Sequence, residues 1–230
     1  STERDLDGSR IGVTGWIDSG NTWTRALLTD AGVGLDRVRW IAGRLTGDHP
    51  VQDRLAGHGR AGWIETDPDE RPLIDLLTGG ELDAVMTPFM PPGFFTPRPL
   101  LRTLHRDLRA AEAAWYARHQ MVPGMHLLGI RADLVARRPE LPAALATVLD
   151  AARTLWRAKR MKYLDASTWL AADLADEARL LASDWNASDR ERQAPMIETF
   201  IGHQRQQGLL STVVEVDDVL DPLDPVARAA

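Results

Sequence analysis

A single histidine, His126, interrupts an apolar run, VPGMHLLGI, at residues 122–130. Because an imidazole titrates near neutral pH, a histidine in such a run could donate or accept a proton in catalysis. The same pattern is typical of a core histidine whose ring nitrogens are satisfied by neighbouring groups. The residues alone leave both interpretations of His126 open.

Arg109, Glu112 and Tyr116 form a second candidate group. They follow one another at intervals of three and four residues within the stretch 107–119, which places them on one side of a helix. Such a side is usually a solvated surface that carries an ion pair. It becomes functional if it faces a cleft, where these groups could orient a substrate or another catalytic residue.

The third candidate group lies in WIDSGNTW, residues 16–23, which joins an apolar run to a helix. Ser19 and Thr22 can each cap that helix, and the N–H groups of its first turn favour a bound carboxylate or phosphate. Trp16 could then form an apolar wall beside the ligand. A simple helix cap next to a core tryptophan is the alternative interpretation.

Several kinds of site are excluded by what the sequence lacks. There is no cysteine, so disulfides, thiol nucleophiles and cysteine-based zinc sites cannot form. The six histidines are scattered and follow no metal-ligand spacing, and neither a Walker loop nor a dinucleotide fingerprint is present. We therefore expect no metal and no cofactor.

The charge distribution and the apolar runs give expectations about partners and location. The net charge is −6 and the arginines alternate with acidic residues, so we expect no nucleic-acid partner. No run approaches the roughly 20 apolar residues of a membrane span, and the polar N-terminus has no signal-peptide pattern. We expect a cytoplasmic protein without a membrane partner.

The elements that position these residues alternate between strands and helices in the first half of the chain. Strands are predicted at 9–16, 38–43 and 82–89, helices at 19–33 and 69–80, and an irregular connection at 43–63. This alternation predicts an α/β fold with a parallel sheet. Thr87 would then lie at the same sheet edge as the loop after the first strand, where it could bind the ligand or simply form a turn.

The second half is predicted to be mainly helical. A proline-rich stretch at 91–99 separates it from the sheet, and helices are predicted at 100–120, 138–164, 167–182 and 189–207. The run 122–130 reads as a buried strand, which must pair with the sheet or bridge two lobes. We predict an α/β ligand-binding lobe at 9–124 and, at 125–230, a return strand with the mainly helical remainder of the other lobe.

Taken together, the motifs resemble the 4,5-dihydroxyphthalate decarboxylase-like family, which is similar in fold to type II periplasmic binding proteins. The resemblance extends from about residue 4 to residue 212. It is carried by DLDGSRIGV, by W..S...W.RALL...GV....RW, by RPLIDLLTGGELDAVM.P...P, by RDLRAAEAAWYARHQMVPGMHLLGIRADL and by ETFIGHQRQQGLL.

The resemblance implies two lobes with a ligand cleft between them and the non-oxidative loss of CO2 from a hydroxylated aromatic acid. It also implies that 122–130 returns from one lobe to the other, with His126 at the cleft. The positions of this chain that fall on family motifs are Trp16, Ser19, Trp23, Arg25, Arg102, Arg109, Glu112, Tyr116 and His126.

Three departures from the family pattern affect this expectation. The family carries an additional N-terminal part of the first lobe, so we expect this lobe to be incomplete here. Phe89 stands where a cation is usual, and WNAS at 185–188 replaces the usual Trp-Pro-Tyr-Gly. Loss of the cation argues against a dianionic phthalate as the substrate.

The resemblance and the chemistry of decarboxylation together assign roles to these residues. A hydroxyaryl carboxylate loses CO2 once the ring carbon that bears the carboxylate is protonated. His126 would donate that proton, and Glu112 and Arg109 would orient His126 or the ring hydroxyl. Substrate contacts would come from Trp16, Ser19, Thr22, Thr87, Phe89 and Tyr116.

Two other functions stay open at this point. The same fold supports a solute-binding protein for a small organic anion, because fold does not fix function. The chain could also be a split or degenerate family member that acts as a homodimer or with a partner chain that completes the first lobe.

Overall fold

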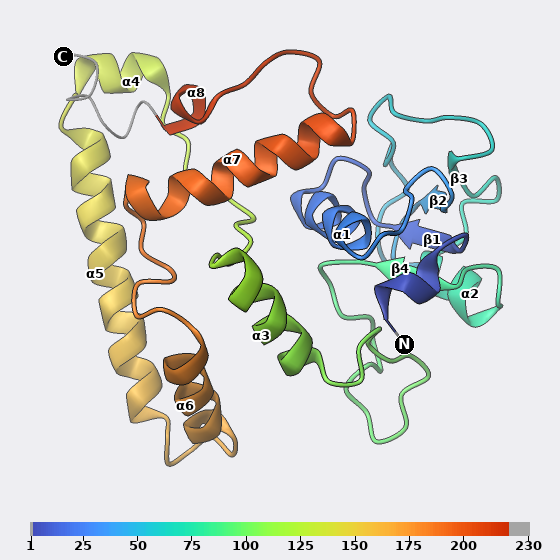
Figure 1. The fold of residues 1–230 in the computed structure, drawn as a ribbon, viewed down its shortest axis with the longest axis horizontal. Helices are drawn as coiled ribbons and strands as arrows, with labels where there is room; N and C mark the ends of the chain where they lie inside the picture. The colour runs from blue at the N-terminus through green and yellow to red at the C-terminus, as the bar shows by residue number, and fades with distance from the viewer. Residues whose placement is uncertain (1, 221–230) are drawn as a thin grey trace. The chain divides into compact units, whose positions relative to one another are not determined.

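The computed structural model describes residues 2–220, which form two compact units (Figure 1). The first unit contains residues 2–108 and 203–209, and the second contains residues 109–202 and 210–220. This division differs from the sequence-based one, because residues 109–124 fall in the second unit and residues 203–209 in the first.

The first unit is built on a parallel sheet of four strands in the order β3-β2-β1-β4 (Figure 1). The strands are β1 (Arg10–Val13), β2 (Arg39–Ala42), β3 (Ile64–Thr66) and β4 (Ala84–Met86). Ile11 of β1 is in register with Trp40 of β2 and with Ala84 of β4. One helix lies between β1 and β2 and another between β3 and β4, so the α/β class predicted from the sequence is confirmed.

Two helices cover opposite faces of the sheet. Alternate residues of a strand point to opposite faces. Ile11 and Val13 pack with Leu28 of α1 (Ser19–Asp30) in one buried cluster, whereas α2 (Leu73–Thr78) contributes Leu73 to a second cluster. A short 3-10 helix, η1 (Glu3–Leu6), adds Leu6 to the α1 side. The first unit is therefore a sheet between two helical layers.

Gly12 of β1 lies directly beneath the α2 layer. A Cβ atom placed on it would be 2.9 Å from Leu82 Cδ1 and 3.1 Å from Leu73 Cδ2. We expect Gly12→Ala to lower the free energy of unfolding by about 1–3 kcal/mol, because the added methyl overpacks a filled core. Urea denaturation measures the change.

Gly47 provides the matched control for this prediction. It is exposed, and a Cβ atom placed on it meets no atom within 4 Å. Gly47→Ala should therefore leave the free energy of unfolding almost unchanged. Equal effects of the two substitutions would contradict the packing described for Gly12.

The secondary-structure elements described in the second unit are all helices. Its elements are α3 (Leu108–His119), α4 (Ala132–Arg137), α5 (Leu141–Lys162), α6 (Leu170–Leu180), most of α7 (Arg190–Gln206) and α8 (Val216–Leu220). Arg160 of α5 pairs with Glu177 of α6 at 2.7 Å, which joins these two helices. Throughout residues 2–220, no helix is long and apolar enough to cross a membrane.

The strand predicted at 122–130 is wrong. These residues form neither a strand nor a helix, and Leu127 and Leu128 are 58% and 60% exposed. A strand needs a neighbour to satisfy its backbone N–H and C=O groups. The part of the second unit that the structure describes contains no strand. The run 122–130 is therefore an exposed apolar segment of the second unit rather than a buried return strand.

Candidate functional site

The carboxyl ends of the parallel strands form one edge of the sheet, which we call the carboxyl edge. Residues 14–18 follow β1, residues 43–49 follow β2, and residues 87–91 follow β4. From β1 the chain continues to β2 on one side, whereas β4 lies on the other side of β1. Ligands of open α/β sheets bind beside such a reversal of strand order. The loops after β1 and β4 are therefore the candidate site.

Side chains of α1 hold the loop after β1 in place. Asn21 Nδ2 donates to the Gly15 carbonyl at 2.7 Å, and Arg25 Nη2 donates to the Trp16 carbonyl at 2.7 Å. Asn21 and Arg25 are both buried, as are Thr14 and Thr22. Buried polar groups are costly unless they are hydrogen-bonded, so this network fixes the loop conformation.

Asp18, rather than Ser19 or Thr22, precedes α1 as its cap residue. The Thr22 N–H and Thr22 Oγ1 donate to the Asp18 carbonyl at 2.9 and 3.1 Å. Ser19 is the first helical residue and is half-buried. The predicted capping by Ser19 or Thr22 is therefore wrong, because the Thr22 hydroxyl donates to a carbonyl instead of accepting from an N–H group. Ser19 still lies where the first-turn N–H groups could meet an anion.

Trp16 lies inside the core. It is 3% exposed, its ring meets the Trp40 ring edge-on with 5.6 Å between centroids, and the Arg25 guanidinium lies 4.1 Å from its centroid. Thr22 has no exposed surface. Trp16 and Thr22 therefore pack beneath the loop and cannot contact a ligand in solvent. Of the three predicted residues, only Ser19 is appreciably accessible.

Thr87 and Phe89 lie together after β4. Thr87 Oγ1 accepts from the Phe89 N–H at 3.0 Å and lies 3.2 Å from the Phe89 carbonyl, so the two residues form a local turn. The Phe89 side chain is 57% exposed. The sequence predicted Thr87 at this edge, and the alternative interpretation of Thr87 as a turn residue describes the geometry.

His49 is a candidate that the sequence analysis missed. Its ring centroid is 6.2 Å from that of Phe89, and its Nδ1 is 2.8 Å from Thr46 Oγ1. The imidazole thus belongs to the carboxyl edge, in the same unit as the loop after β1. The signal in the sequence is its position a few residues after the strand predicted at 38–43, which places it at the carboxyl edge.

Within the second unit, Arg109 connects α3 to α6, and Tyr116 connects α3 to the segment that follows α6. Arg109 pairs with Asp173 and, at 2.5 Å, with Asp176, and hydrogen bonds to these carboxylates raise its pKa. The Tyr116 hydroxyl is buried and accepts from the Ala182 N–H at 3.0 Å. Glu112 is exposed. The Arg109 side chain therefore carries the ion pair that one of the two interpretations predicted.

His126 is exposed in the segment 122–130. Its neighbours Met125 and Leu127 are 45% and 58% exposed, so the second unit by itself does not enclose the imidazole in an apolar pocket. The structure thus gathers Trp16, Ser19, Thr22, Thr87 and Phe89 at one edge of the first unit, and Arg109, Glu112, Tyr116 and His126 in the second.

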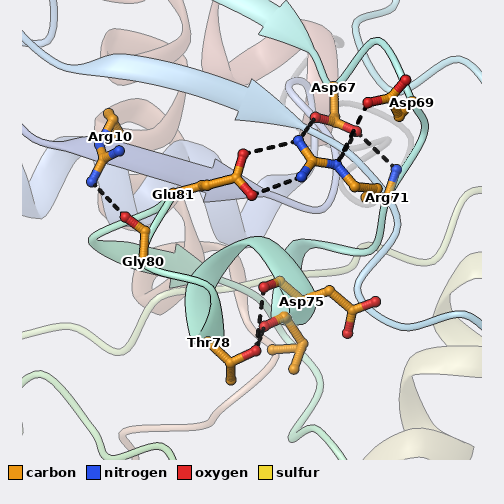
Figure 2. Close-up of polar contacts among 9 residues, drawn as sticks. Arg10, Asp67, Asp69, Arg71, Asp75, Thr78, Gly80 and Glu81 are labelled. Carbon is orange, nitrogen blue, oxygen red and sulfur yellow. Dashed lines mark hydrogen bonds and ion pairs between the residues drawn. The ribbon is translucent and has the colours of Figure 1, made fainter.

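Two acidic side chains of the first unit, Asp67 and Glu81, form ion pairs with Arg71. Among the described residues, no three His, Asp or Glu side chains are grouped to hold a metal ion. Figure 2 shows Arg71, at the start of the α2 segment, between Asp67 and Glu81. Its Nη2 lies 2.7 Å from Asp67 Oδ1 and its Nη1 lies 2.7 Å from Glu81 Oε1. This clamp joins the end of β3 to both ends of α2.

The Arg71 clamp should make stability depend on acid pH. Hydrogen bonds from Arg71 hold the pKa of Asp67 below its ordinary value of 3.8. Because this pKa is lower in the folded state, Asp67 contributes fully to the free energy of unfolding at any pH above its unfolded-state pKa. That contribution is lost as the pH falls through the folded-state pKa. We expect Asp67→Asn to lower the thermal midpoint at pH 7 and to weaken its decline in acid. Thermal scans from pH 7 to pH 3 measure both effects.

Asp69 provides the control for this prediction. Its carboxylate is 4.0 Å from Arg71 Nε and its side chain is 76% exposed, so Asp69→Asn should change the pH profile little. A profile of Asp67→Asn that matches the wild type would contradict the role given to Asp67.

The sequence of the chain is similar to that of known enzymes. No family model matches the chain. Among curated proteins, "4,5-dihydroxyphthalate decarboxylase" of Comamonas testosteroni is 26% identical over 223 residues, which are 95% of this chain and 67% of that protein. A protein of the same name from Pseudomonas putida is 32% identical over 113 residues, 49% of this chain and 44% of that protein. The chain is similar in sequence to these two proteins named 4,5-dihydroxyphthalate decarboxylase.

This relationship confirms the resemblance that the sequence motifs predicted. The chain spans about two thirds of the length of the Comamonas testosteroni decarboxylase, as the aligned 67% shows. The motif at 16–40 and residues 203–209 of the motif at 198–210 belong to the first unit, where the Trp23 ring contacts the His203 ring.

Proposed function

We propose that the protein is a cofactor-independent decarboxylase that acts on a hydroxylated aromatic or heteroaromatic carboxylic acid. The observation that carries this proposal is the similarity to the Comamonas testosteroni decarboxylase over 95% of the chain. The exposed Phe89, at a position where a cation is usual in the family, favours an acid with fewer negative charges than a dianionic phthalate.

The proposed reaction needs a proton donor and a place for the carboxylate. A proton is first added to the ring carbon that bears the carboxylate. The bond between this carbon and the carboxylate carbon then breaks. The electron pair of that bond returns to the ring, and CO2 leaves. No oxidant or reductant takes part. We propose that His126, whose imidazole is accessible to solvent, donates the proton.

The carboxyl edge supplies the proposed substrate contacts. The first turn of α1, with Ser19, would hold the carboxylate, because unpaired N–H groups and the helix dipole favour an anion there. Phe89 would lie against the aromatic ring, and Thr87 would bind a ring substituent. Trp16 and Thr22 would act from the buried side by fixing the loop after β1.

The two-lobe fold of type II periplasmic binding proteins is part of this proposal. The parallel sheet of the first unit, with helices on both faces, supports it. In such a fold the substrate binds between the lobes, and Arg109, Glu112 and Tyr116 would belong to the lobe that carries His126.

The proposal is tested by incubating the protein with a panel of hydroxylated aromatic and heteroaromatic acids while CO2 release and thermal stabilisation are recorded together. Release of CO2 from an acid that also stabilises the protein is the expected result. Stabilisation without CO2 would instead support a solute-binding protein. If neither is observed, the protein acts only with a second copy or a partner chain, or has lost the activity.

A further inference from the structure

The segment His203–Leu209, at the end of α7 and just after it, belongs to the first unit. The His203 ring meets the Trp23 ring edge-on with 5.5 Å between centroids. Leu209 packs against the buried cluster that includes Ile11 and Trp16. This segment is far from α1 in the sequence, since Arg25 and Gln207 are 182 positions apart.

Gln207 joins this segment to α1 by two hydrogen bonds. Its Oε1 accepts from Arg25 Nε at 2.7 Å, and its Nε2 donates to the Thr22 carbonyl at 2.9 Å. A side-chain amide can accept and donate at once, whereas an ionised carboxylate only accepts and an apolar side chain does neither. Both contacts therefore require glutamine at this position.

Arg25 carries the connection from Gln207 to the loop after β1. Its side chain has no exposed surface, and burial lowers its pKa to about 10. Its Nη2 donates to the Trp16 carbonyl at 2.7 Å. Among the described residues its Nη1 has no hydrogen-bond partner. A buried cation with so few acceptors depends strongly on each of them, so the Gln207 amide is needed to keep the guanidinium against the loop.

We infer that Arg25 and Gln207 are a positioning pair, through which docking of residues 203–209 sets the conformation of the loop after β1. The Trp16 carbonyl held by Arg25 lies two residues before Asp18, from which α1 begins. The pair thereby fixes the direction of the first-turn N–H groups. Only one part of this inference rests on the proposed function, namely that the first-turn N–H groups of α1 bind the substrate.

The test compares Gln207→Leu and Gln207→Glu with Gln206→Leu, a change at the neighbouring exposed residue. Hydrogen exchange is measured at the amides of Trp16, Asp18 and Thr22, whose N–H groups are hydrogen-bonded in the structure. Gln207→Leu should exchange at these amides at least about tenfold faster, because a buried hydrogen bond to a charged group is lost. Gln207→Glu can still accept from Arg25 but cannot donate to the Thr22 carbonyl, so its exchange should increase less. Protection in β1 and β2 serves as the control for folding, and Gln206→Leu should match the wild type.

A second measurement uses an acid that the wild type decarboxylates. Gln207→Leu should raise KM about tenfold with a much smaller change in kcat, as expected when ground-state binding is weakened. Unchanged exchange at Trp16, Asp18 and Thr22 would overturn the coupling. Faster exchange with an unchanged KM would overturn the positioning role. If no acid is decarboxylated the proposed function fails, and the exchange result alone then supports or overturns the coupling.

Discussion

Replacing His126 with glutamine is expected to lower kcat for decarboxylation by about 100- to 10,000-fold, the usual contribution of a general acid. Glutamine approximates the shape of the imidazole and retains a hydrogen-bond donor, but it cannot release a proton near neutral pH. His126 is exposed, so the substitution should not change the thermal midpoint. Initial rates of CO2 release with saturating acid measure the effect.

His49 provides the discriminating comparison for that result. It lies at the carboxyl edge beside Phe89, in the same unit as the proposed carboxylate site. We expect His49→Gln to change kcat by less than about tenfold, which is well below the loss expected of a general acid. A large loss in His49→Gln together with full turnover in His126→Gln would transfer the role of proton donor to His49.

Truncating Trp40 is expected to have the largest effect on stability. Trp40 has no exposed surface, meets Trp16 edge-on, and donates from its indole Nε1 to the Leu35 carbonyl at 3.0 Å. Trp40→Ala should lower the free energy of unfolding by about 3–5 kcal/mol, because the sheet loses buried apolar area and a cavity remains. Chemical denaturation followed by circular dichroism measures the change.

Trp169 is the matched control, since its side chain is 75% exposed. Trp169→Ala removes the same number of atoms, yet its cost should stay within about 0.5 kcal/mol, as for surface substitutions in general. A similar loss in both variants would contradict the core described for the first unit.

The sequence was sufficient for the α/β part of the fold because its signals are local there. Apolar runs bounded by glycine and helix-start residues located β1, β2, β4, α1 and α2 to within a few residues. The strand β3, at Ile64–Thr66, was not predicted, because three residues are too short to show a period. Helix α3 begins at Leu108 rather than near residue 100, after a long segment without regular structure.

The candidate site could be predicted only in part. Sequence order placed Ser19, Thr87 and Phe89 at one edge, because parallel strands all end on the same side of a sheet. It could not show that Trp16 is buried or that Gln207 reaches Arg25, since such contacts depend on tertiary packing between distant segments. The run 122–130 misled the prediction because its apolar composition is typical of a buried strand, whereas burial requires a partner.

The edge contact between Trp16 and Trp40 gives the first unit an optical signature of its own. Two indoles with centroids 5.6 Å apart and planes inclined by 74° are close enough for their electronic transitions to couple. That coupling contributes a circular dichroism signal only while the two rings are held in this geometry. In the second unit the indole of Trp169 is exposed, so its fluorescence should already resemble that of tryptophan in water. Loss of this circular dichroism signal therefore reports unfolding of the first unit without labels.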